Sequence, residues 1–82
     1  MNATPAQVAA ATTILERLVF LVPSGIETNA HADMASIIAE PDSWDVHATN
    51  WALESAVEST AEWTRNGYED APSAAALAAI VR

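Results

Sequence analysis

The sequence has 82 residues, which is enough for one domain with a single hydrophobic core. Eleven acidic residues, three arginines and no lysine give it a formal net charge of −8. Nucleic-acid binders neutralise phosphates with lysine and arginine, so this balance argues against direct contact with DNA or RNA, and its sign argues against anionic membranes. It favours a protein partner with a basic surface; the alternative is that the charge only keeps the domain soluble. The absence of cysteine excludes a disulfide framework, a thiolate metal site and a nucleophilic thiol.

No segment has the pattern of a membrane span or a signal peptide. The most apolar stretch, residues 14–22, is interrupted by Glu16 and Arg17, and no basic region precedes it. We therefore expect a single acidic domain over residues 1–82 without a membrane anchor.

The first expected helix covers residues 5–22. Thr4 and Gln7 have the spacing of a capping box, and Pro5 stands at the first helical position, where its missing N–H costs nothing. Pro23 then ends the helix. The apolar positions that repeat at helical spacing between these signals are Val8, Ala11, Leu15, Leu18 and Val22.

The second expected helix covers residues 25–39. Ser24 and Glu27 have the spacing of another capping box, and Pro41 follows the last residues of the helix. Its apolar stripe consists of Ile26, Ala30, Met34, Ile37 and Ile38.

A third and a fourth helix complete the expected fold. Asp42 or Ser43 would cap the third, over residues 43–66, and Gly67 stands where a left-handed C-terminal glycine belongs. The fourth, over residues 71–81, is rich in alanine. No window alternates with the period of a strand. The sequence therefore predicts an all-α fold, a compact four-helix small domain.

Five acidic residues are explained by helix capping or the helix dipole, whereas three in the third helix are not. Those at helix starts, each stabilised by a few tenths of a kcal/mol, are Glu27, Asp42, Asp45, Glu69 and Asp70. Glu54, Glu58 and Glu62, which we call the acidic row, stand four residues apart inside the third helix. Like charges at that spacing destabilise a helix by roughly 0.2–0.5 kcal/mol per pair.

Helical periodicity places His47 and Trp51 on the same face as the acidic row, opposite the core side of the third helix. Tryptophan is over-represented among the residues that dominate binding energy at interfaces. This face is therefore a candidate partner-binding surface. The alternative is a solvated charged face with Trp51 packed under a neighbouring element.

Catalytic and metal chemistry find little support in the sequence. His31 and Asp33 are two residues apart and would point away from each other on a helix, and His47 has Trp51 where a second ligand would stand. The serines lie in no nucleophile motif, and the two glycines form no phosphate-binding loop. We expect no catalytic residue, no metal site and no cofactor, and the prediction is that the protein is not an enzyme.

The doubled dipeptides Glu54-Ser55 and Glu58-Ser59, in a small acidic chain, resemble the phage-encoded inhibitors of uracil-DNA glycosylase, which mimic DNA. That resemblance implies a protein that occupies the DNA groove of an enzyme, with carboxylates where phosphates would lie. It covers these four residues only, and it implies the cytoplasm of a bacterial host as the location. Members of that group are built around a β-sheet, whereas this chain shows no strand pattern.

The sequence thus predicts an acidic protein inhibitor that binds the DNA-contacting surface of a nucleic-acid enzyme, with uracil-DNA glycosylase as the specific target. The predicted partner-binding residues are His47, Trp51, Glu54, Ser55, Glu58, Ser59 and Glu62. The alternative is a small helical adaptor or assembly module that acts through apolar helix faces. Mimicry requires the acids and weakens with salt, whereas an adaptor tolerates salt.

Overall fold

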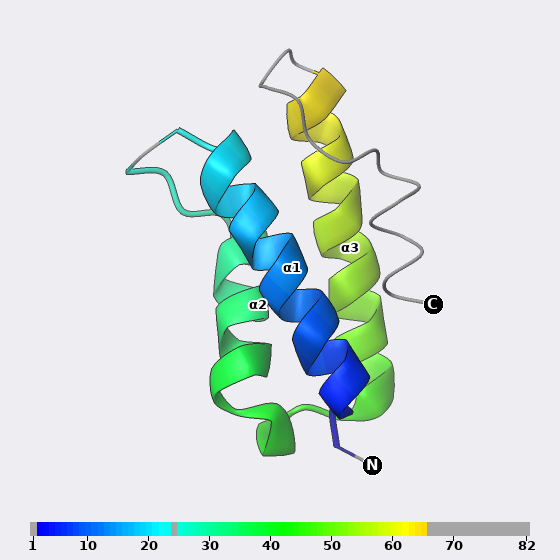
Figure 1. Cartoon of the computed structure of the whole chain (residues 1–82). Coiled ribbons are helices and arrows are strands. Elements are labelled where there is room, and N and C mark those ends of the chain that lie inside the picture. Colours follow the sequence, from blue (N-terminus) through cyan, green and yellow to red (C-terminus); the bar gives the residue numbers. More distant parts are fainter. Residues whose placement is uncertain (1, 24, 66–82) are drawn as a thin grey trace.

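The computed structural model describes residues 2–23 and 25–65 of the chain, and in this part the fold is all-α. It contains the helices α1 (Pro5–Leu21), α2 (Asn29–Ala39) and α3 (Val46–Arg65), with a short 3₁₀ turn, η1 (Pro41–Ser43), before α3 (Figure 1). Within the described residues, β-type pairing is limited to an isolated bridge between Asn2 and Asp45. The small all-α domain is confirmed, with three described helices. The expected fourth helix, over residues 71–81, lies outside the described residues.

The start of α1 follows the predicted capping box. The Thr4 side chain accepts a hydrogen bond from the Gln7 backbone N–H, and the Gln7 side chain accepts one from the Thr4 N–H. Pro5 occupies the first helical position. The helix ends at Leu21, and Val22 adopts an extended conformation as its C-cap. Pro23 disfavours helical backbone at the residue before it, which explains why α1 ends one residue earlier than predicted.

The predicted start of α2 is wrong by four residues. The helix begins at Asn29 and is capped by Thr28, whose side chain accepts from the backbone N–H of His31. The His31 ring nitrogen Nδ1 accepts in return from the Thr28 N–H at 3.1 Å, which completes a capping box. Gly25 has a φ of +93°, a left-handed conformation that no α-helix contains. The helix therefore does not begin at residue 25, and Ile26 is half exposed instead of facing the core. Ser24, the first residue of the box proposed with Glu27, lies outside the described residues.

The predicted start of α3 is also too early. Pro41–Ser43 form the 3₁₀ turn, so α3 begins at Val46 and not at residue 43. The capping residue is Asp45, and neither Asp42 nor Ser43 takes that role. One carboxylate oxygen of Asp45 accepts hydrogen bonds from the backbone N–H groups of His47 at 2.9 Å and Ala48 at 3.4 Å.

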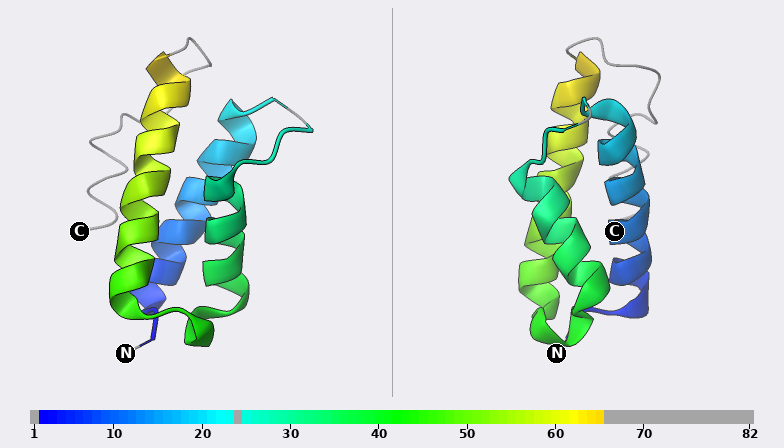
Figure 2. Two further views of the ribbon diagram at one scale, coloured as in Figure 1. Left: turned by 180° about the vertical axis from the view of Figure 1, so that it is seen from behind. Right: turned by 90° about the vertical axis from the view of Figure 1, so that its left-hand side faces the viewer.

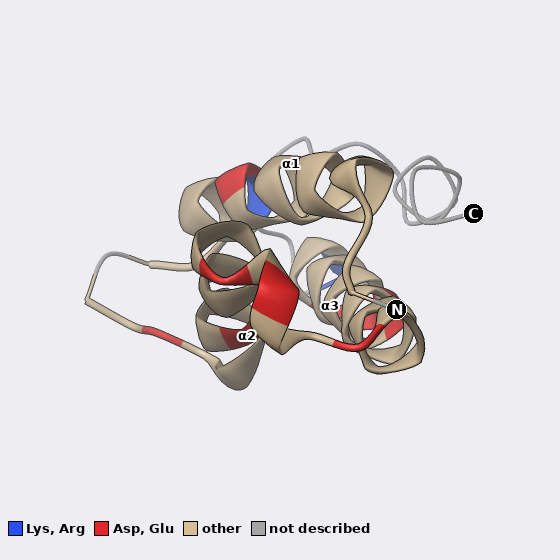
Figure 3. Ribbon diagram, turned by 90° about the horizontal axis from the view of Figure 1, so that it is seen from below, with Lys and Arg blue, Asp and Glu red and all other residues tan. Residues whose placement is uncertain are grey.

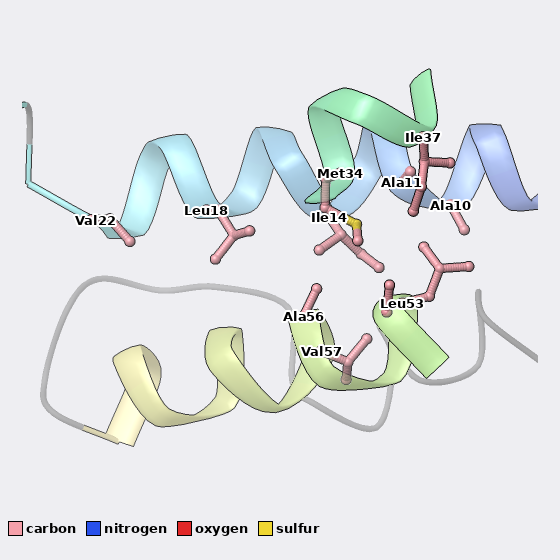
Figure 4. Close-up of a cluster of buried hydrophobic side chains, with 11 residues drawn as sticks. Ala10, Ala11, Ile14, Leu18, Val22, Met34, Ile37, Leu53, Ala56 and Val57 are labelled. Atoms are coloured by element: carbon pink, nitrogen blue, oxygen red, sulfur yellow. The ribbon is translucent and has the colours of Figure 1, made fainter. Parts of the chain in front are cut away.

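The three helices run alternately up, down and up, and each packs against the other two (Figures 1 and 2). Their apolar faces meet along the axis of the bundle (Figure 4). On α3 the core side also includes Thr49 and Thr60, which are fully buried. Their hydroxyls donate to the backbone carbonyls of Asp45 and Val57, so burial leaves neither hydroxyl without a partner. The buried apolar side chains are Ala10, Ala11, Ile14, Leu18, Leu21, Val22, Met34, Ile37, Ala52, Leu53, Ala56 and Val57.

Candidate protein-binding surface

The first turn of α3 is held in place by groups from two parts of the chain. The cap hydrogen bonds fix the Asp45 carboxylate, and the His47 N–H, followed by the Ala48 N–H, lowers the pKa of that carboxyl below its ordinary value of 3.8. From α1, the side-chain amide of Gln7 donates to the Val46 carbonyl at 3.0 Å. The Gln7 hydrogen bond ties the start of α3 to α1, and the packing of its buried face in the core leaves the opposite face outward.

The predicted site residues lie on the outer side of α3. His47, Trp51, Glu54, Glu58 and Glu62 are exposed. Among them Trp51 stands out, because 71% of its surface is accessible although it is a large aromatic residue. Ser55 is exposed and Ser59 is half-buried. The alternative placement of Trp51, under a neighbouring helix or loop, is therefore not found among the described residues.

Part of this face borders a groove between α2 and α3, which we call the Trp51 groove. It has a volume of about 260 Å³. Its floor contains Ala52 and Ala56, whose small side chains leave room between the two helices. The residues that line it are Asn29, Ala30, Asp33, Trp51, Ala52, Ser55, Ala56 and Ser59. The predicted surface thus has two parts, since none of the three glutamates of the acidic row lines the groove.

The acidic row has no neutralising partner within the described chain. Its three carboxylates make no hydrogen bond or ion pair there, and Arg65 does not pair with Glu62 although it follows one turn later. Figure 3 shows that acidic positions (red) occur on all three helices, while basic positions (blue) occur on α1 and α3. Among residues 2–23 and 25–65, nothing therefore offsets the repulsion that the sequence predicts inside α3.

Asp33 is a member of the groove that sequence reasoning did not select as a binding residue. It is half-buried on α2 and makes no hydrogen bond or ion pair within the described chain. His31 lies elsewhere, buried in the capping box of α2, so the two residues belong to different sites. Within the described residues, no group of three or more His, Cys, Asp or Glu side chains is arranged to hold a metal ion.

A second exposed surface lies at the end of α1 and in the loop that follows it. Val19, Phe20 and Ile26 are exposed by 65%, 56% and 50%, which is high for large apolar side chains. The Arg17 guanidinium stacks over the Phe20 ring, with 4.9 Å between its carbon and the ring centroid. A cavity of about 430 Å³ adjoins this surface, and Leu15 and Ile26 are among the residues that line it.

Across residues 2–23 and 25–65, no helix is both long enough and apolar enough to cross a membrane. No protein-family model matches the chain, and neither does any curated protein or any solved structure.

Proposed function

We propose that this chain is an acidic inhibitor that binds the DNA-contacting surface of a nucleic-acid enzyme through the outer face of α3, with uracil-DNA glycosylase as the specific target. The observation that carries the proposal is the acidic row, three exposed carboxylates on one helix face that pair with no group of the described residues, together with the exposed Trp51. A solvated face of a small domain has no need for an exposed tryptophan beside unrelieved like charges.

Two physical effects support binding by this face. A net charge of −8 attracts a basic surface over long range and raises the association rate. Trp51 then supplies the apolar contact area that holds a complex together at short range. The charge would therefore raise the rate of association, and the aromatic ring would lengthen the lifetime of the complex.

The acidic row alone imitates only a short stretch of DNA. Glutamates four residues apart place one charge per roughly 6 Å of helix, whereas a duplex carries one per about 1.7 Å of its axis. Glu40, Asp42 and Asp45 are exposed around the start of α3 and extend the negative surface beyond the row. A phage-encoded inhibitor acting in the cytoplasm of a bacterial host is the setting that fits this proposal.

An inhibition assay with uracil-DNA glycosylase tests the proposal directly. Uracil release from a uracil-containing duplex is measured with increasing amounts of the full chain, at low and at high salt. We expect the chain to inhibit uracil release, and we expect both salt and excess undamaged DNA to relieve the inhibition. The variant with glutamine at 54, 58 and 62 should not inhibit. Unchanged uracil release would remove this enzyme as the target.

Capture of partners from a bacterial lysate on the immobilised chain tests the wider proposal. The retained proteins should be nucleic-acid enzymes, and added DNA should elute them. If neither DNA nor salt elutes the retained proteins, DNA mimicry is wrong.

The second candidate function is a helical adaptor or assembly module. The observation that favours it is the apolar surface of Val19, Phe20 and Ile26 with its adjoining cavity. Binding through this surface would survive high salt and would be lost in Phe20→Ser, while the triple glutamine variant would bind like the parent.

A further inference from the structure

We infer that the Trp51 groove is a receptor for an arginine side chain that projects from the basic partner surface. The inference rests on the proposed function, because it names the partner group that one part of the binding face receives. It differs from that function in its physics, since it depends on a shaped groove and an aromatic ring and not on the summed charge of the domain.

The walls of the groove match the chemistry of a guanidinium group. The exposed indole of Trp51 offers a π face for stacking, and the half-buried carboxylate of Asp33 lies on the opposite helix as an acceptor that no group of residues 2–23 and 25–65 uses. A guanidinium is planar, stacks on aromatic rings and pairs with carboxylates through two parallel N–H groups. The hydroxyls of Ser55 and Ser59 supply further acceptors along the same wall.

The floor of the groove explains why a long side chain can enter it. Three small residues line the space between α2 and α3, where larger side chains would fill it: Ala30, Ala52 and Ala56. The resulting volume of about 260 Å³ is open to solvent beside Trp51. The aliphatic stem of an arginine would lie over these methyl groups while its head reaches Asp33.

Charge complementarity selects this occupant over an apolar or acidic one. No described basic residue lines the groove, the domain carries a net charge of −8, and Asp33 contributes a negative charge inside it. A lysine would satisfy the charge, but its compact ammonium cannot stack flat on Trp51 and pair bidentately with Asp33 at once. The geometry therefore predicts that the groove discriminates arginine from lysine.

The test compares two soluble peptides of equal length and charge, one alternating glycine with arginine and one alternating glycine with lysine. Their binding to the full isotope-labelled chain is followed by nuclear magnetic resonance. We expect the arginine peptide to bind about threefold more tightly, with the largest shifts at the Trp51 indole N–H and the Asp33 amide. Trp51→Leu should abolish the preference, and it should leave the helical far-ultraviolet spectrum unchanged because the side chain is exposed.

Two matched variants separate the groove from the acidic row. Asp33→Asn should weaken the arginine peptide more than Glu16→Gln, which removes the same charge from an exposed residue of α1 that does not line the groove. The triple glutamine variant at 54, 58 and 62 should weaken both peptides equally and keep the preference for arginine. If both peptides bind the parent equally, or neither binds, the arginine receptor is wrong. Loss of affinity in the triple variant would still support the acidic row.

A second copy of this chain is the other occupant that the experiment detects. If the Trp51 and Asp33 signals shift with protein concentration in the absence of peptide, the groove is a dimer contact and the inference is overturned. If Trp51→Leu binds both peptides as the parent does, the indole is not part of the receptor, and the inference again fails.

Discussion

Gln7 and Val46 are 39 residues apart in the chain, yet the Gln7 side-chain amide donates a hydrogen bond of 3.0 Å to the Val46 carbonyl. The side-chain oxygen of Gln7 simultaneously accepts from the Thr4 N–H at 2.9 Å. One side chain therefore caps α1 and fixes the start of α3 beside it. Because α3 carries the candidate surface, the orientation of that surface depends on a residue of another helix.

Gln7→Glu separates these two roles. A glutamate still accepts from the Thr4 N–H, but it places an acceptor opposite the Val46 carbonyl where a donor is needed. We expect the free energy of unfolding to fall by about 1–2 kcal/mol, and the melting temperature by about 4–8 °C per kcal/mol. Thermal unfolding followed by circular dichroism measures the change, and a variant as stable as the parent would show that the long-range hydrogen bond contributes nothing.

Asp45→Asn isolates the charge of the α3 cap. The His47 and Ala48 N–H groups lower the pKa of Asp45 below 3.8, so its charged form stabilises the folded state at neutral pH. That contribution is present above 3.8 and is lost as the pH falls through the lowered pKa. Asparagine also caps helices but does not titrate. The parent should therefore melt above the variant at neutral pH, and the difference should close in acid; a constant difference would contradict a role for the charge.

Gly25→Ala tests the turn between α1 and α2. A Cβ at this position would meet no atom within 4 Å, so no steric contact opposes the substitution. The φ of +93° is nevertheless unfavourable for any residue with a Cβ, and we expect a loss of roughly 1–2 kcal/mol in denaturant unfolding. Gly25→Asn should lose less, because asparagine tolerates left-handed backbone. Equal stability of all three proteins would show that the loop relaxes freely.

Glu58→Gln is predicted to stabilise the domain while weakening its complex. Glu58 has a like-charged neighbour on each side, so its neutralisation relieves two repulsions, for a gain of roughly 0.4–1 kcal/mol. An exposed charge that steers association acts mainly on the association rate, so we expect slower binding to the partner with little change in dissociation. Melting temperature and binding kinetics are measured on the same protein.

Glu16→Gln is the control for that variant. It removes the same charge from an exposed position on α1, away from the acidic row. It should leave both stability and association rate closer to those of the parent. If Glu58→Gln gains stability and binds at the parental rate, the acidic row is only a solvated helix face.

The contrast between α1 and α2 shows which helix boundaries the sequence predicts. Thr4 and Gln7 form a capping box that local chemistry alone specifies. For α2 the same pattern at Ser24 and Glu27 was misleading, since the true box pairs Thr28 with a histidine, His31. Histidine is not the usual partner at that position, and its role depends on burial of the ring against the bundle.

The two parts of the candidate surface, the outer face of α3 and the Trp51 groove, also differ in how well the sequence predicts them. Helical periodicity predicted that Trp51 and the acidic row face outward, because rotation about α3 determines that property. The Trp51 groove was not predicted, since Asp33 and Asn29 reach it from α2 through tertiary packing. The sequence placed His31 and Asp33 on different sides of a helix, but it could not show that Asp33 lies opposite Trp51.

Long-range hydrogen bonds join the start of the chain to the start of α3 at one end of the bundle. Residues 2–7 contact residues 41–46 there, including the Ala3 N–H, which donates to the Trp44 carbonyl at 2.9 Å. At the other end, the Ile26 N–H donates to the carbonyl of Pro23, three residues earlier in the chain. Backbone amides should therefore exchange with solvent deuterium fastest around the last turn of α1 and the first turn of α2, where local opening suffices. Asn29 begins α2 at this looser end and lines the Trp51 groove, so slowed exchange in that turn would report that the groove is filled.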